Sequence, residues 1–297
     1  KLPLVFSGCL LGLAGAGNLV ADTWPALSHL FSLIGLILWI YFLILHLFNR
    51  KETRQELTKP PLLSGMATSP MAGMILSTYV FRLFPHLPLV AQGLWWFSFL
   101  LDLVLIAGFT IKFACPGRRV HATPSWTVLY VGIAVAALTY PLVGIIEIAY
   151  ATLIFGFLLT FYLYPLIYSD LKKQPLPLAL LGQEGIYCAP FSLLLASLIR
   201  VGGAGLPTWL LIVMILASQS FFFFVLTRLP NILKQGFQPA FSALTFPTII
   251  TATSLKMAQG ILKLPFLDYL VLAETVICLT ILFFVLGAYL IWLRKKV

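Results

Sequence analysis

Two carboxylates, Asp102 and Glu184, stand inside long apolar stretches of the chain, where a charged side chain is costly and marks a functional site by default. Asp102 lies near the middle of residues 88–111, and Glu184 lies about one turn into residues 180–199. Such carboxylates can take up and release protons, so both are candidate polar or proton-binding sites. Two plainer interpretations stay open: a hydrogen bond from Asp102 to a neighbouring helix, and a solvated Glu184 at a helix end.

Other chemistry has little support in the sequence. It contains no HExxH, GxSxG or P-loop motif. The four cysteines lack CxxC and metal-ligand spacing, which favours free thiols, and the four histidines are scattered. Asp268 and Glu274, near the start of residues 267–293, fit a helix N-terminus, where negative charge is favourable. The sequence therefore predicts a protein that is not an enzyme and has neither cofactor nor metal.

The stretch GFQPAFSALTFPTIITATS, residues 236–254, is apolar enough to cross a bilayer yet carries Pro239, Pro247 and six hydroxyl side chains. A proline inside a helix removes one N–H and frees the carbonyl four residues earlier. Lipid offers such a carbonyl no partner, whereas a protein interior or a water-filled cavity does. The stretch is therefore better suited to a pore wall than to a lipid-facing helix, although prolines in membrane helices often serve packing alone.

Composition places the chain in a membrane. Of its 297 residues 61% are hydrophobic and 9% charged, whereas soluble domains carry about 25% charged residues. Apolar runs of roughly 20 residues mark membrane spans, and we predict one domain, residues 1–297, with ten. The spans are residues 4–21, 26–48, 64–81, 88–111, 125–142, 145–168, 180–199, 207–227, 237–255 and 267–293.

The net charge of +10 is best explained by topology, not by nucleic-acid binding. If the first residue is cytoplasmic, ten spans place fifteen of the 19 basic residues on the cytoplasmic side and leave four outside. This is a strong positive-inside bias, and it predicts cytoplasmic N- and C-termini in the plasma membrane. The four outer residues are Arg82, Arg200, Lys256 and Lys263.

The predicted spans differ by parity. Odd spans carry prolines or, in the first span, the glycine run SGCLLGLAGAG, whereas even spans are mostly uninterrupted Leu, Ile, Phe, Val and Trp. This pattern predicts an all-α integral membrane fold of five helical hairpins, with even helices facing lipid and odd helices surrounding a central pore. The residues expected to line it are Gly8, Gly12, Pro70, Pro141, Pro190, Ser242, Ala243, Pro247 and Thr253.

Several segments resemble the tellurite-resistance/dicarboxylate transporter family, which includes plant guard-cell slow anion channels, sulfite exporters and malate carriers. They are SGCLLGLAGAGNL, HATPSW, CAPFSLLLAS and GFQPAFSALTFPTIITATS, and they follow the family order over nearly the whole chain. The resemblance implies five hairpins around a pore in each subunit of a homotrimer. It also implies a phenylalanine that blocks the pore, which in SALTFPT is Phe246. The family often has proline in the first span where this chain has Gly8-Cys9-Leu10-Leu11-Gly12.

Helix geometry is compatible with a gate at Phe246, although ordinary core packing fits the residue as well. At 100° per residue, Ser242, Ala243 and Thr253 lie within about 60° of its direction. A ring among small side chains would project into a narrow lumen. Arg82, Arg200 and Lys256 each follow the end of an odd span, so they could form an anion funnel at the outer mouth or simply anchor helix ends at the headgroups.

Three functions stay open at this point. The first is a gated channel that passes small inorganic or organic anions. The second is a proton-coupled carrier or exporter of dicarboxylate, sulfite or tellurite, with Asp102 or Glu184 in the coupling. The third is a membrane enzyme or scaffold without transport. No Lys or Arg lies at mid-membrane depth, and the resulting weak attraction favours conduction, since an ion must leave as well as enter.

Overall fold

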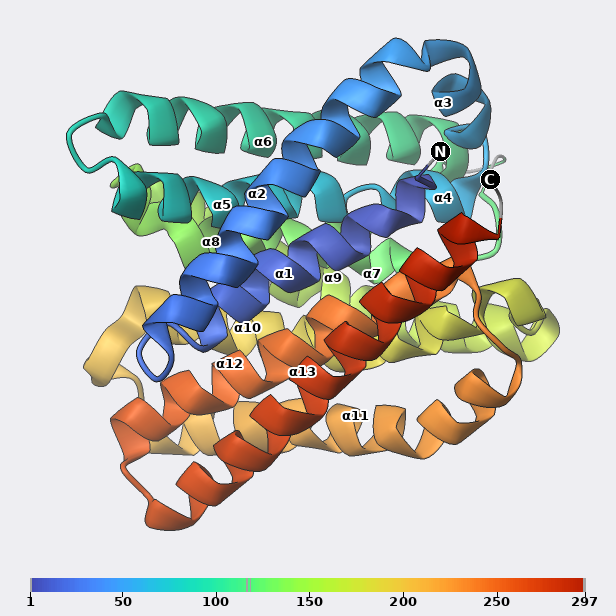
Figure 1. Ribbon diagram of the computed structural model, residues 1–297. Coiled ribbons are helices and arrows are strands. Elements are labelled where there is room, and N and C mark those ends of the chain that lie inside the picture. Colours follow the sequence, from blue (N-terminus) through green and yellow to red (C-terminus); the bar gives the residue numbers. More distant parts are fainter. Residues whose placement is uncertain (1, 116, 118, 296–297) are drawn as a thin grey trace.

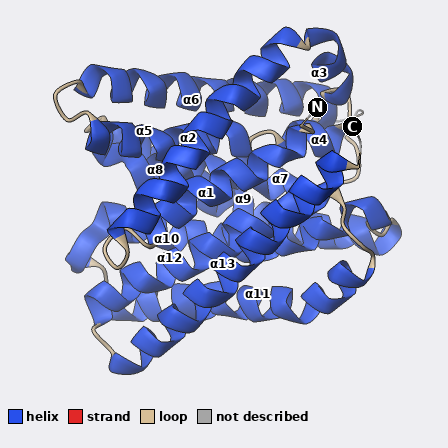
Figure 2. Ribbon diagram, in the orientation of Figure 1, coloured by secondary structure: helices blue, strands red, loops and turns tan. Residues whose placement is uncertain are grey.

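The computed structural model describes residues 2–115, 117 and 119–295, which form helices and loops without strands (Figure 2). Of the basic residues expected on the cytoplasmic side, Lys1, Arg118 and Lys296 lie outside the described residues. The α-helices are α1 (Ser7–Leu19), α2 (Pro25–Phe48), α3 (Arg50–Glu56), α4 (Pro60–Gly65), α5 (Thr68–Leu83), α6 (Pro88–Phe109), α7 (Ser125–Val131), α8 (Val135–Thr139), α9 (Ile146–Lys173), α10 (Ala189–Gly202), α11 (Thr208–Lys234), α12 (Thr245–Leu262) and α13 (Pro265–Arg294).

Seven helical segments in the described chain are long and apolar enough to cross a membrane, and Leu4–Leu19 is a shorter apolar helix. Together with α5 and α12 these match the ten predicted runs in position. The fold is therefore all-helical with multiple candidate spans, as expected, while the count of ten spans stays a prediction. The start of α1 and the end of α13 lie together near α4 (Figure 1), and we call this the terminal end of the bundle.

Burial divides the long segments into two groups. In α2, α6, α9, α11 and α13, only 28–33% of the most apolar window is buried. The share rises to 72% in residues 125–142 and 61% in residues 178–205. The first group corresponds to the even predicted spans, and its exposed side chains are large and apolar, as lipid contact requires.

The more deeply buried helices contact one another in a closed ring. Helix α1 packs against α5 and α12, α10 packs against α12 and α8, and α8 packs against α5. Each long outer helix covers this ring: α2 on α1, α6 on α5, α9 on α7 and α8, α11 on α10, and α13 on α12. The ring brings together residues from the first and last thirds of the chain (Figure 1).

Every helix of the ring is interrupted, mostly by 3₁₀ segments. These are η1 (Leu4–Phe6) before α1, η3 (Gly132–Ala134) and η4 (Tyr140–Leu142) around α8, η5 (Leu178–Cys188) before α10, and η7 (Pro239–Leu244) before α12. The remaining break separates α4 from α5. Irregular backbone at membrane depth needs protein or a water-filled cavity beside it, which is what an inner position supplies.

Three prolines of the ring lie in the first turns of α-helical segments, whereas Pro141 and Pro239 belong to the 3₁₀ segments η4 and η7. Pro70, Pro190 and Pro247 fall in the first turns of α5, α10 and α12, where a missing N–H costs little. A proline frees the carbonyl four residues earlier, which predicts free carbonyls at Met66 and Ile186. This prediction is wrong, because Ser69 N–H donates to the Met66 carbonyl at 2.8 Å and Ala189 N–H donates to that of Ile186. These three prolines therefore mark where a 3₁₀ or loop segment gives way to α-helix.

Glycines of α1 allow it to approach η7 and α12 closely. A Cβ on Gly12 would lie 2.7 Å from Thr245 Oγ1, and one on Gly15 would lie 3.2 Å from the Phe246 ring. Thr245 Oγ1 donates to the Gly8 carbonyl at 2.9 Å, which ties the two helices together. Small residues serve membrane helix packing in this way because they let backbones meet.

Candidate functional site

A narrow, mostly apolar cavity of about 60 Å³ lies inside the ring, toward the terminal end. Its wall comes from every part of the ring, from Val5 of η1 to Pro247 of α12. Among the described residues that line it there is no Lys, Arg, Asp or Glu. Five of the residues expected to line a pore do line it: Gly8, Pro190, Ser242, Ala243 and Pro247. We call this space the inner cavity.

Phe246 also lines the inner cavity, with its side chain only 3% exposed. Its ring lies against Gly15 of α1, where an added Cβ would be in tight contact with it at 3.2 Å. The cavity wall around it includes apolar side chains of Leu11, Met71 and Leu193. An ion would have to shed water to pass such a constriction, so the position is suited to a barrier.

A wider cavity of about 660 Å³, the outer cavity, opens at the opposite end of the bundle. Arg82, Arg200 and Lys256 all line it, together with Pro141 and Thr253. The structure thus brings three of the four basic residues predicted for that side around one opening. The fourth, Lys263, does not line it. Three cations around one concavity raise the local concentration of anions.

Two of the three cations in the outer cavity are held by the end of α1 and the turn after it. Arg82 Nη2 donates to Asn18 Oδ1 at 2.9 Å, and Lys256 Nζ donates to the Leu19 carbonyl at 2.8 Å. Asp22 Oδ2 lies 3.5 Å from the same Nζ. Arg200 has no hydrogen bond or ion pair with any described residue, so its charge is the least compensated of the three.

The two cavities are separate. They share no lining residue, and on α12 the inner cavity ends at Pro247 while the outer cavity begins at Thr253. Six residues of helix correspond to roughly 9 Å at 1.5 Å per residue. Phe246 therefore lies where the inner cavity ends, next to the stretch of α12 that separates the two cavities. Gly12 and Pro70, also expected in a pore wall, are buried and line neither cavity.

The predicted polar sites have different surroundings. Asp102 is fully buried in α6, and neither carboxylate oxygen has a hydrogen-bond partner among the described residues. Glu184 of η5 is paired with Arg228 of α11 through two bonds of 2.9 and 3.0 Å. The pair is bidentate and half-buried, so Glu184 behaves as part of a structural ion pair and not as an isolated charge.

Glu274, expected from the sequence at a helix N-terminus, lies deeper in its helix and is buried. It lies in the third turn of α13, because that helix begins at Pro265, and its side chain is 1% exposed. The carboxylate lies beside the Gln219 amide of α11, outside hydrogen-bond geometry. The N-terminal dipole acts over the first turn, so it does not account for this carboxylate. Among the described residues, no three His, Cys, Asp or Glu side chains gather in a metal-binding arrangement.

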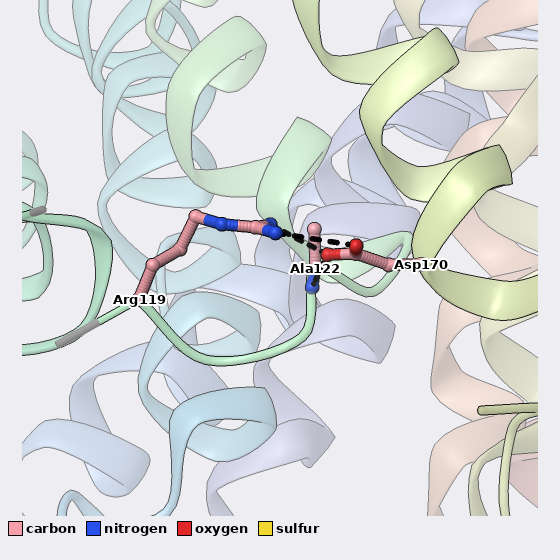
Figure 3. A network of polar contacts seen from close by, with 3 residues as sticks. All are labelled: Arg119, Ala122 and Asp170. Carbon is pink, nitrogen blue, oxygen red and sulfur yellow. Dashed lines mark hydrogen bonds and ion pairs between the residues drawn. The ribbon is translucent and has the colours of Figure 1, made fainter. Parts of the chain in front are cut away.

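A polar network, which the sequence did not suggest, fixes the loop before α7 (Figure 3). Asp170, near the end of α9 and 1% exposed, accepts from Arg119 at 2.6 and 3.3 Å and from Ala122 N–H at 2.8 Å. The hydrogen bond that Arg119 donates to Asp170 raises the pKa of the Arg119 guanidinium. This loop leads directly into Ser125, a wall residue of the inner cavity, so the network positions that wall.

We expect Asp170→Ala to lower the free energy of unfolding by about 1–3 kcal/mol, because it leaves the buried Ala122 N–H without an acceptor. Thermal melting in detergent measures the effect. Asp22→Ala is the matched control, since its 87% exposed side chain contributes little. Equal melting temperatures for the two variants would show that the network does not stabilise the loop.

The long apolar helices are typical of an integral membrane protein, and two separate cavities, one apolar and one lined by three cations, lie along its helical ring. The chain matches the voltage-dependent anion channel family over residues 1–290, and it belongs to that family. The resemblance found in the sequence motifs is thereby confirmed, and membership implies anion transport across a membrane. A comparison with curated proteins found no match.

Proposed function

We propose that the chain is a gated anion channel whose pore runs through each subunit and is closed by Phe246. One observation carries this proposal. Two cavities lie end to end within the ring, one apolar and ending near a buried phenylalanine, the other open and bearing three cations. A wide basic mouth concentrates anions, and an apolar constriction beyond it stops them until the ring moves.

The proposal includes ten membrane-spanning helices in one domain, residues 1–297, arranged as five hairpins with odd helices inside. Support comes from the closed ring of interrupted helices and from the low burial of the five long outer helices. The charge bias supports cytoplasmic termini in the plasma membrane. A homotrimer rests on the family resemblance, with lipid covering the remaining apolar faces.

Cysteine accessibility tests the inner position of α12 against the outer position of α13. We expect cysteines at Ser242 and Thr253 to react with a small water-soluble thiol reagent, because both line cavities. A cysteine at Phe283, which is 55% exposed on α13, should be protected by lipid. The four native cysteines are first replaced. Equal protection of all three positions would contradict the proposed pore.

A proton-coupled anion carrier is the second candidate, and the buried carboxylates Asp102 and Glu274 favour it. Under the channel proposal, neither Asp102→Asn nor Glu274→Gln changes the dependence of flux on the anion gradient. Uphill anion uptake driven by a pH gradient and abolished by either substitution would favour the carrier. A properly folded preparation without any flux would leave the third possibility, a membrane enzyme or scaffold.

A further inference from the structure

Of the polar side chains that the structure describes in the inner cavity wall, Gln183 alone has its hydrogen-bonding capacity unused. It belongs to η5, is 4% exposed and lines the cavity with Phe246. Its Oε1 has no partner, and no described residue bonds its Nε2. Burying an amide without partners costs free energy, so such a group in a cavity wall is poised for a ligand.

The hydroxyls of the same wall are already engaged with protein atoms. Thr68 Oγ1 donates to the Gly65 carbonyl, Thr127 Oγ1 to that of Pro124 and Ser242 Oγ to that of Pro239, at 2.8–3.1 Å. Ser125 Oγ shares hydrogen bonds with Ser64 and Thr123. The Gln183 amide is thus the available N–H donor of this wall, and rotation of the amide can present its two N–H groups to a ligand.

The surroundings of Gln183 suit a negative ligand. The neighbouring carboxylate, Glu184, is turned to Arg228 in a bidentate pair, which neutralises it. The backbone of η5 is held rigidly against η7, since a Cβ on Gly182 would collide with the Ala240 carbonyl. The amide is therefore carried by a closely packed 3₁₀ backbone, next to a wall whose described residues are uncharged.

We propose that the Gln183 amide coordinates the permeating anion in the inner cavity and sets how strongly hydrated an anion can be and still pass. This inference rests on the proposed channel function. An anion that enters the apolar cavity loses water, and two amide N–H groups replace part of that hydration. The compensation matters most for strongly hydrated anions such as chloride, and least for weakly hydrated ones such as thiocyanate.

The test compares Gln183→Met, which keeps the length but removes the N–H donors, with Gln183→Asn, which keeps an amide. Each is measured in liposome currents, alone and together with Phe246→Ala. We expect Gln183→Met to reduce chloride conductance at least about tenfold, the effect of losing a hydrogen bond to a charged ion. Thiocyanate conductance should change less, so the thiocyanate-to-chloride ratio rises. Gln183→Asn should restore part of the chloride conductance.

Gln219→Met is the matched control, because Gln219 is also a buried glutamine without hydrogen bonds but lines neither cavity. Its ion ratio should equal that of the wild-type chain. An unchanged ratio in a folded, conducting Gln183→Met variant would overturn the role of Gln183 and leave the channel standing. Absence of anion current in every variant, the Phe246→Ala background included, would overturn the channel and this inference together.

Discussion

Phe246→Ala should raise anion conductance at least about tenfold, which needs only about 1.4 kcal/mol off the barrier. The ring is almost fully buried at the boundary of the inner cavity, and its neighbour on α1 is Gly15, which has no side chain to refill the space. Alanine would leave a void that water can enter, and a hydrated path lowers the cost of moving an ion. Single-channel recording of reconstituted protein measures the change.

Phe222→Ala is the control for this substitution. Phe222 is 1% exposed in α11 and lines neither cavity, so its truncation removes the same atoms from the core. It should lower stability by about 3–5 kcal/mol without a rise in conductance. If Phe246→Ala folds normally and conducts no better than the wild-type chain, the residue is a packing element and the gate lies elsewhere.

Neutralising Arg82, Arg200 and Lys256 together to glutamine should lower conductance several-fold at low salt and little at high salt. All three line the outer cavity, and salt screens exposed charges over about 8–10 Å at physiological ionic strength. Of the three single substitutions, Arg200→Gln should cause the largest loss of conductance at low salt, since Arg82 and Lys256 already donate hydrogen bonds to protein oxygens. Conductance recorded over a series of salt concentrations gives the comparison.

Lys263→Gln supplies the reference, because Lys263 belongs to the same group of basic residues but does not line the outer cavity. It should leave conductance unchanged at every salt concentration. A triple variant that behaves like Lys263→Gln would mean that these cations anchor helix ends at the headgroups and do not attract anions.

The division into outer and inner helices could be predicted from the length of the hydrophobic runs and from the positions of prolines and glycines. The runs predicted the long outer helices, because lipid contact requires continuous apolar helix. The clustering of Arg82, Arg200 and Lys256 followed from helix direction, because each lies in the second half of a ring helix that starts toward the terminal end. Arg82 and Arg200 lie in the last turns of α5 and α10, whereas α12 continues beyond Lys256 to Leu262. These features depend on local sequence and helix direction, both of which can be inferred from one sequence.

The features that escaped prediction depend on packing between distant segments. Pro190 and Pro247 resembled kinks because the sequence does not reveal that 3₁₀ segments precede them. Glu274 resembled a helix-end residue because the start of α13 and its burial against α11 are tertiary facts. Gln183 was not predicted as a site residue, because an amide becomes a candidate ligand-binding group only when its neighbours are known to hydrogen-bond to other protein atoms.

Anion flux in liposomes tests the central claim most directly. Purified protein is reconstituted with a chloride or nitrate gradient, and the membrane potential is set with potassium and an ionophore. The channel account predicts a flux that reverses at the equilibrium potential of the anion and does not depend on a pH gradient. It also predicts a much larger flux in Phe246→Ala. Uphill accumulation driven by a pH gradient, or no flux above empty liposomes from folded protein, would contradict it.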